Sequence, residues 1–319
     1  MVEKVVISDV ELILSEPADV QMDWVGNDDL INELKAAWMV VDKSDLPLTP
    51  RILGKPGVGK TTLAYAAGKR LGKDVYMFQC TMDTRPEDLL ISPVISSDKK
   101  IAYVASSLVS AMIKGGVCLL DEGNRMSEKS WASLAPLMDK RRYVESIIAG
   151  IRIYADPEFR LCVTMNSDSS TYEIPEYIQS RLQPKILIDF PNKVDEIKIL
   201  SYNLPFASEE ILKYCANFLQ NAHLHDEPYT VRDGINILRF YMKSRELNGK
   251  DKNTLDKSEF EKALIQVLEE AASNYLPENY EEFLKEQKES ISFKIFKDIE
   301  EVDEYYDKFV KRDNEDSNG

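Results

Sequence analysis

The chain has 319 residues, of which 44% are hydrophobic, enough for one large globular domain or two medium ones. Its 40 basic and 55 acidic residues give a formal charge of −15, which argues against non-specific binding to nucleic acid or anionic membranes. No stretch is long and apolar enough for a membrane span, and charges interrupt the first 14 residues, which therefore lack the apolar core of a secretory leader.

Residues 1–23 read as a polar N-terminal extension with one strand-like run from Val5 to Leu14. A helical pattern over 27–41 follows, and then short apolar runs alternate with helical patterns. The runs lie at 51–53, 75–80, 117–120, 159–164 and 185–189, and the helical patterns at 60–71, 107–114, 127–139 and 176–182. Such alternation predicts a parallel α/β sheet flanked by helices, with ligands at the carboxyl ends of the strands.

Strand patterns stop near residue 191, and only helical patterns follow. They lie at 193–203, 208–222, 230–246, 257–273 and 293–311. The sequence therefore predicts an α/β domain over 24–191 and a helical domain with a C-terminal extension over 192–311. Residues 312–319 are polar and acidic and are expected to be disordered.

Cysteine usage indicates the compartment. The four cysteines, Cys80, Cys118, Cys162 and Cys215, form no C-x-x-C pair, and the chain has only two histidines. A zinc site is therefore not predicted, and the thiols are typical of a reducing, cytoplasmic protein.

The first apolar run of the predicted sheet leads into a phosphate-binding loop. The pattern G-x-x-x-x-G-K-[ST] is met by Gly54-Lys55-Pro56-Gly57-Val58-Gly59-Lys60-Thr61. Its glycines let backbone N–H groups face a polyphosphate, Lys60 reaches the β- and γ-phosphates, and the Thr61 hydroxyl suits Mg²⁺. The candidate nucleotide-binding residues are Gly54, Pro56, Gly57, Val58, Gly59, Lys60, Thr61 and Thr62.

Polar side chains end two further strands of the predicted sheet. Asp121 and Glu122 follow the apolar run at 117–120, and Asn166 follows the run at 159–164. Asp121 is the candidate to hold Mg²⁺ together with Thr61, and Glu122 the candidate to polarise an attacking water. A phosphate loop combined with Asp-Glu predicts hydrolysis of a nucleoside triphosphate, and Asn166 is placed to hold the water or touch the γ-phosphate.

These motifs together resemble the AAA+ ATPases, and within them the MoxR-like and dynein-related group. The run Asp121-Glu122-Gly123-Asn124-Arg125 is similar to that group's D-E-x-N-R signature, and Val25-Gly26 to its entry motif. The resemblance covers about residues 24–241. It implies a P-loop sheet domain followed by an all-α lid, with ATP and Mg²⁺ bound between them.

The resemblance also implies roles for residues outside the loop. Asn166 would be sensor 1, Arg181 an arginine finger acting on the neighbouring subunit's γ-phosphate, and Arg232 the sensor 2 residue of the lid. A hairpin over 143–154 and an insertion over 89–106 would face the pore or the client, with Tyr103 as a possible contact. The assembly would be a homo-oligomer, with a hexameric ring as the family suggests.

The preferred function is therefore an ATP-hydrolysing ring ATPase that remodels or assembles protein partners, including clients with a von Willebrand factor A domain. Two alternatives stay open. One is a nucleic-acid-directed NTPase, since Thr164-Met165-Asn166 also resembles the GTP-using McrB group. The other is a nucleotide-gated scaffold with slow hydrolysis.

Overall fold

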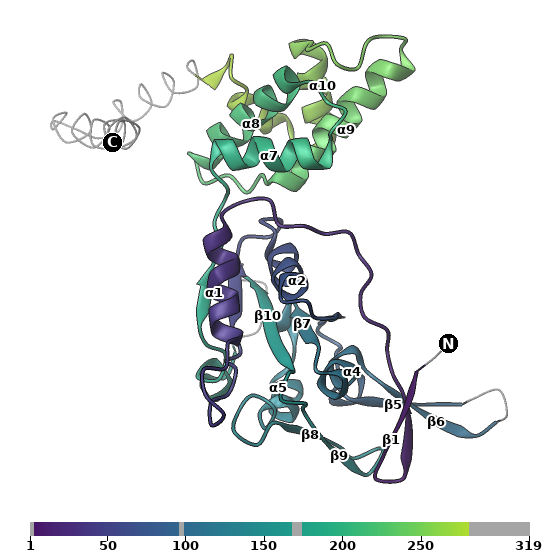
Figure 1. Ribbon diagram of the computed structural model, residues 1–319. Coiled ribbons are helices and arrows are strands. Elements are labelled where there is room, and N and C mark those ends of the chain that lie inside the picture. Colours follow the sequence, from purple (N-terminus) through teal and green to yellow (C-terminus); the bar gives the residue numbers. More distant parts are fainter. Residues whose placement is uncertain (1–2, 96–98, 168–173, 281–319) are drawn as a thin grey trace.

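The computed structural model describes residues 3–95, 99–167 and 174–280. Figure 1 shows an α/β domain, which contains the strands, and a helical domain stacked on one end of it. Among the described residues, no helix has the length and apolar character that crossing a membrane requires. The helix predicted over 293–311 and the tail over 312–319 lie outside the described residues.

The α/β domain is built on a five-stranded parallel sheet in the order β11-β3-β10-β7-β4. The strands are β3 (Arg51–Gly54), β4 (Val75–Gln79), β7 (Val117–Asp121), β10 (Arg160–Asn166) and β11 (Lys185–Leu187). The helices are α1 (Asp28–Trp38), α2 (Lys60–Arg70), α3 (Pro86–Leu89), α4 (Ser107–Lys114), α5 (Glu128–Leu134) and α6 (Glu176–Gln179). The predicted fold class, a parallel sheet flanked by helices and followed by further helices, is confirmed.

Strand β7 shows why this sheet is covered on both faces. Its side chains alternate, with Val117 and Leu119 packing into the cluster that α1 and α2 build, and Cys118 and Leu120 into the cluster on the opposite face. All four are fully buried. Because both faces of β7 are apolar, its polar side chain, Asp121, stands at the carboxyl end of the strand, at the edge of the sheet.

The N-terminal segment differs from its prediction. Instead of one strand over 5–14, the chain forms a hairpin of β1 (Lys4–Ile7) and β2 (Val10–Ile13). The prediction of a single strand was wrong because Ser8 and Asp9 take left-handed backbone angles, with φ of 47° and 65°, which make a tight hairpin turn. Strand β2 then pairs in parallel with the insertion strand β6.

The insertion and the second hairpin form as predicted. Strands β5 (Ile91–Ile95) and β6 (Ile101–Ala105) pair antiparallel and complete a four-stranded sheet with β1 and β2. Strands β8 (Tyr143–Ser146) and β9 (Ile151–Tyr154) form a separate hairpin. Tyr103 of β6 is partly buried against the core, opposite Leu12, which favours packing over client contact for its ring.

The helical domain has its own core. Its helices are α7 (Lys193–Asn203), α8 (Glu209–His223), α9 (Val231–Leu247) and α10 (Lys257–Val267), followed by the 3-10 helix η2 (Glu270–Tyr275). One helix was predicted over 257–273, but the structure ends α10 at Val267 and continues in 3-10 form.

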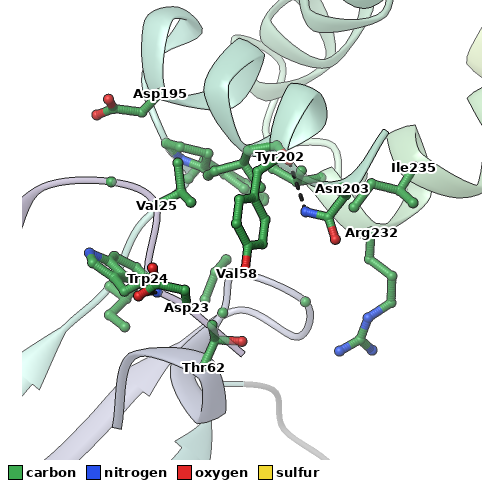
Figure 2. Close-up of a pocket in the computed structure, with 18 of the residues that line it drawn as sticks. Asp23, Trp24, Val25, Val58, Thr62, Asp195, Tyr202, Asn203, Arg232 and Ile235 are labelled. Carbon is green, nitrogen blue, oxygen red and sulfur yellow. Dashed lines mark hydrogen bonds between the residues drawn. The ribbon is translucent and has the colours of Figure 1, made fainter. Parts of the chain in front are cut away.

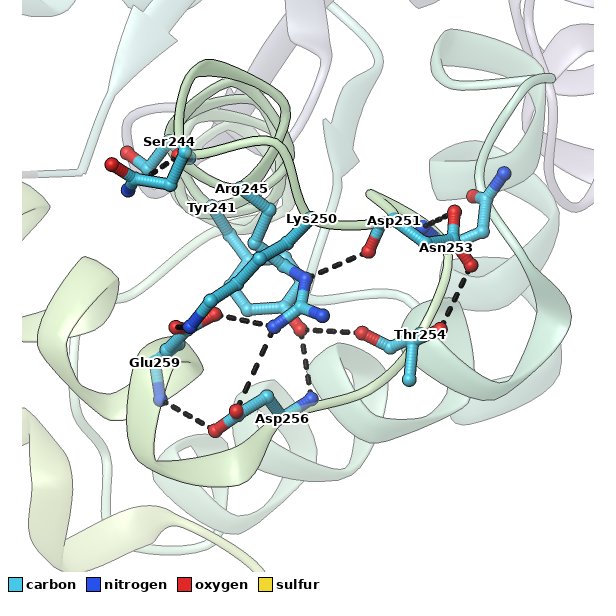
Figure 3. Close-up of polar contacts among 10 residues, drawn as sticks. Tyr241, Ser244, Arg245, Lys250, Asp251, Asn253, Thr254, Asp256 and Glu259 are labelled. Carbon is cyan, nitrogen blue, oxygen red and sulfur yellow. Dashed lines mark hydrogen bonds and ion pairs between the residues drawn. The ribbon is translucent and has the colours of Figure 1, made fainter.

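A buried arginine fixes the turn between α9 and α10 (Figure 3). Arg245 is 7% exposed, donates from Nε to the carbonyl of Asp251 at 2.8 Å and pairs with Glu259. The Tyr241 hydroxyl donates to the carbonyl of Thr254 and accepts from the backbone N–H of Asp256, each at 2.8 Å. The bonds of Arg245 are charge-assisted, and together with those of Tyr241 they tie the segment between α9 and α10 to both helices.

Candidate active site

The phosphate loop lies where the sequence predicts it, between the end of β3 at Gly54 and the start of α2 at Lys60. Gly57 and Gly59 have φ of 83° and 98°, angles that side-chain-bearing residues rarely adopt. The Lys60 ammonium is folded over the loop and donates to the carbonyls of Gly54 at 2.9 Å and Lys55 at 2.8 Å. The loop thus surrounds a cation at a helix N-terminus, which suits an anionic phosphate.

The predicted magnesium ligands are in contact. Asp121, at the end of β7, accepts a hydrogen bond at its Oδ1 from the Thr61 hydroxyl at 2.8 Å. A hydroxyl and a carboxylate beside a phosphate site are the oxygen donors that Mg²⁺ takes up, with phosphates and waters completing its shell. The residues therefore fit the ion, and Thr61 and Asp121 would hold it; bound there it would neutralise phosphate charge.

The Glu122 carboxylate is held by two hydrogen bonds and one ion pair. Gln79 and Asn166 each donate a side-chain N–H to it at 3.1 Å, and Arg125 Nε lies 2.7 Å from its Oε2. Glu122 itself has a left-handed backbone, with a φ of 55°, directly after the end of β7. Sites often store such backbone strain where a side chain must be aimed.

The structure adds residues that sequence reasoning missed. The Thr164 hydroxyl, fully buried in β10, donates to Asp121 and accepts from the backbone N–H of Glu122 at 3.1 Å. Asn124 donates from its Nδ2 to the carbonyl of Asn166 at 2.9 Å. The available signal was Thr164 itself, a polar side chain inside a continuously buried strand, since buried hydroxyls require a partner.

A cavity of about 520 Å³ separates the phosphate loop from the helical domain. Figure 2 shows Arg232 of α9 and Tyr202 of α7 pointing into it from above, towards Val58 and Thr62 on the loop side. Predicted residues Gly57, Val58, Gly59, Thr62 and Arg232 all line this cavity. Its volume lies in the range of small-molecule sites.

The helical domain touches the loop directly. A Cβ added to Gly57 would lie 2.7 Å from the hydroxyl oxygen of Thr230, the N-cap of α9. The Lys55 ammonium lies 4.7 Å from the centre of the Phe190 ring, and that ring stacks on His223 of α8 at 3.8 Å. Burial lowers the pKa of His223, so the imidazole in this stack is neutral near pH 7.

Arg181 lies elsewhere. It does not line the cavity; its Nε sits 3.7 Å from Asp139, and it donates to the carbonyl of Tyr177. Asp139 is charged throughout the physiological range because hydrogen bonds from Arg141, with help from Arg181, lower its pKa to about 2. Hydrogen bonds thus bring Thr61, Asp121, Glu122 and Asn166 together, in part through Thr164. Arg232 lies on the cavity wall, and Arg181 belongs to neither group.

Comparison with known proteins agrees with this geometry. The dynein-related subfamily of AAA domains matches residues 51–182. The chain is 31% identical over 113 residues to the denitrification regulatory protein NirQ of Pseudomonas aeruginosa, covering 35% of this chain and 43% of that protein. It is 27% identical over 157 residues to Protein MoxR of Paracoccus denitrificans, covering 49% of this chain and 45% of that protein. The chain spans less than half the length of the curated relatives it matches.

Solved structures share the fold. The RuvB Holliday junction branch migration motor of Thermotoga maritima has a TM-score of 0.52 at 16% identity, covering 77% of this chain and 72% of that one. NtrX of Brucella abortus in complex with ADP has a TM-score of 0.51 at 17% identity, covering 74% of this chain and 54% of that one. At such identities the likeness shows the fold alone. With its phosphate loop and Asp-Glu strand end, the segment 51–182 matches the dynein-related subfamily of AAA domains, and the chain is similar to the MoxR and NirQ proteins.

Proposed function

We propose that the protein hydrolyses ATP, with Mg²⁺, in a homo-oligomeric ring of six subunits, and uses the cycle to remodel or assemble protein partners. One observation carries the hydrolytic part. The Thr61–Asp121 contact of 2.8 Å and the Asn166–Glu122 contact of 3.1 Å gather the phosphate loop and two strand ends at one point. That convergence supplies phosphate binding and a carboxylate for water in one site.

Each residue has a role in this reaction. Lys60 and the loop N–H groups hold the β- and γ-phosphates. The oxygen of the attacking water bonds to the γ-phosphorus while Glu122 takes a proton from that water. The bond between the γ-phosphorus and the bridging oxygen breaks, and ADP leaves with that oxygen. Asn166 orients that water, and Arg232 contacts the γ-phosphate from the lid.

The position of Arg181 supports a site completed between subunits. Its partly exposed guanidinium pairs with Asp139 at 3.7 Å, whereas the partners of Glu122 are Gln79, Asn166 and Arg125. A guanidinium supplied in trans stabilises transition-state charge and is worth roughly 10³- to 10⁵-fold in rate. Hydrolysis would then depend on assembly.

The net charge supports protein clients, and the free thiols support a reducing cytoplasm. The net charge is −15, and on the β8–β9 hairpin Arg152 lies 3.5 Å from Glu145 and 4.4 Å from the Tyr143 ring centre. A paired arginine is a poor phosphate ligand, so this hairpin does not favour nucleic acid. All four cysteines are buried and free. We assign a protein carrying a von Willebrand factor A domain as the client to test first.

The test is steady-state turnover with Glu122→Gln. Removal of a general base costs roughly 10²- to 10⁴-fold, while ATP affinity should be kept because the phosphate loop is unchanged. The matched control is Glu128→Gln, an exposed acid in the first turn of α5, which should hydrolyse as the wild type does. Equal turnover of all three proteins would remove Glu122 from this role.

A further inference from the structure

A lysine of the phosphate loop contacts the region where the two domains meet. The Lys55 ammonium lies 4.7 Å from the centre of the Phe190 ring and 4.0 Å from Asp226 Oδ1. Phe190 belongs to the connection between β11 and α7, and Asp226 to the turn between α8 and α9. Among the described residues, those that line the cavity do not include Lys55. Because a cation is attracted to the electron-rich face of an aromatic ring, this side chain is directed at the domain junction.

The Phe190 ring is fixed to the helical domain. It stacks on His223 of α8, with the ring centres 3.8 Å apart and an angle of 8° between the ring planes. The next residue, Pro191, accepts a hydrogen bond at its carbonyl from the Gln220 side chain at 3.0 Å. Two consecutive residues of the connection are thus tied to α8, so the contact of Lys55 with Phe190 joins the phosphate loop to that helix.

His223 extends this contact to the start of α9. Its Nε2 lies 2.6 Å from the carbonyl of Tyr229. A neutral imidazole carries one N–H and a carbonyl can only accept, so Nε2 donates this bond. The next residue, Thr230, is the N-cap of α9, and Arg232 follows in the first turn, where it points into the cavity (Figure 2). His223 therefore bonds to the backbone three residues before Arg232.

We propose that Lys55 is a positioning residue for Arg232, and that it acts through the Phe190 ring and His223 to hold the start of α9 over the phosphate loop. This inference rests on the proposed function, in which Arg232 contacts the γ-phosphate, and it adds the loop residue that sets the place of that contact. Because Lys55 acts through Arg232, its loss should weaken a nucleotide that has a γ-phosphate and spare one that lacks it.

The test measures the binding of two probes to the full chain, with Mg²⁺, by titration calorimetry: ADP, and ATPγS as a slowly hydrolysed nucleotide with a γ-phosphate. Lys55→Met removes the charge and should weaken ATPγS by roughly 2- to 5-fold while ADP binding stays unchanged. Lys55→Arg keeps a cation that suits an aromatic face and should bind both probes as the wild type does. The matched control is Lys69→Met, which removes a cation 5.7 Å from the Tyr65 ring centre within α2 and should also bind both probes normally.

A double-mutant cycle tests whether Lys55 acts through Arg232. Once Arg232→Ala has removed the guanidinium, Lys55→Met should have no further effect on ATPγS binding. An effect of the same size with and without Arg232 would show that the two residues act independently and would overturn the inference. His223→Phe keeps a ring beside Phe190 but cannot donate to the Tyr229 carbonyl, so it should weaken ATPγS and spare ADP as Lys55→Met does. Unchanged ATPγS binding by His223→Phe would contradict the route through His223.

The remaining outcomes separate this inference from the proposed function. If the wild type binds neither probe, the proposed nucleotide function fails and the inference fails with it. If the wild type binds ATPγS and Lys55→Met binds it equally well, the inference is wrong and nucleotide binding stands. If Lys55→Met weakens ADP and ATPγS by the same factor, Lys55 supports the phosphate loop itself and does not position Arg232, which also overturns the inference.

Discussion

A buried carboxyl group of α7 makes the stability of the helical domain depend on pH. Glu196 of α7 is fully buried; its Oε2 accepts from Gln220 at 2.9 Å, and within the described ranges its Oε1 has no hydrogen-bond partner. Burial raises its pKa from 4.5 to about 8, and the Gln220 bond opposes this only in part. The thiol of Cys215 beside it stays protonated, since burial raises its pKa as well.

The direction in which stability changes with pH follows from the difference between the Glu196 pKa in the folded and in the unfolded chain. The folded domain holds the Glu196 proton more tightly than the unfolded chain, so the stabilisation is fully present below pH 4.5 and falls until pH passes about 8. One pKa unit corresponds to about 1.36 kcal/mol, and the shift therefore amounts to several kcal/mol in total. Glu196→Gln has no proton to lose and keeps an acceptor for Gln220, so it should not show this decline.

Hydrogen exchange of the α7 and α8 amides measures the effect within the helical domain. Wild type and Glu196→Gln should exchange alike at pH 5, and at pH 8 the variant should be protected by on the order of 10²-fold or more, since 1.4 kcal/mol is tenfold. Glu210→Gln, which alters an exposed carboxylate on α8, should follow wild type at both pH values. The reasoning is refuted if wild type and Glu196→Gln differ by the same factor at pH 5 and pH 8.

Two further predictions concern the site. Thr164→Val should destabilise the α/β domain by about 1–3 kcal/mol, because it leaves the Glu122 N–H without its buried acceptor. Chemical unfolding should show this loss of stability. Thr164→Ser keeps the hydroxyl and should restore the stability of the wild type. Gly57→Ala should weaken ATP binding, because its Cβ would lie 2.7 Å from the Thr230 hydroxyl at a φ of 83°. Gly72→Ala, with a φ of 70° and nothing within 4 Å, should cost only the backbone strain of about 1–2 kcal/mol and leave ATP affinity unchanged.

The parallel sheet and the loop were predictable because their signals are local. Short continuously apolar runs separated by helical patterns fix a buried parallel sheet, and the loop glycines and Lys60 lie within eight residues of sequence. Strand ends of one sheet meet at the same edge, so the grouping of Asp121, Glu122 and Asn166 with the loop also followed from the pattern.

Long-range contacts were beyond the same reasoning. Nothing in the order of residues reveals that Gln79 reaches Glu122, 43 residues away, or that Tyr202 of α7 lies over the loop. The N-terminal hairpin was missed for a local reason: Ser8-Asp9 is a weak turn signal inside an otherwise apolar run.

The central claim is that hydrolysis occurs at Glu122 in a site completed by Arg181 of a neighbouring subunit. Glu122→Gln and Arg181→Ala should each be nearly inactive alone. Co-expressed with different tags and purified as one assembly, they should regain ATP turnover, because Glu122→Gln subunits supply Arg181 to the intact Glu122 of Arg181→Ala subunits. A mixed assembly that stays inactive, while wild type purified in the same way hydrolyses ATP, would contradict the shared site; wild type without turnover would contradict hydrolysis itself.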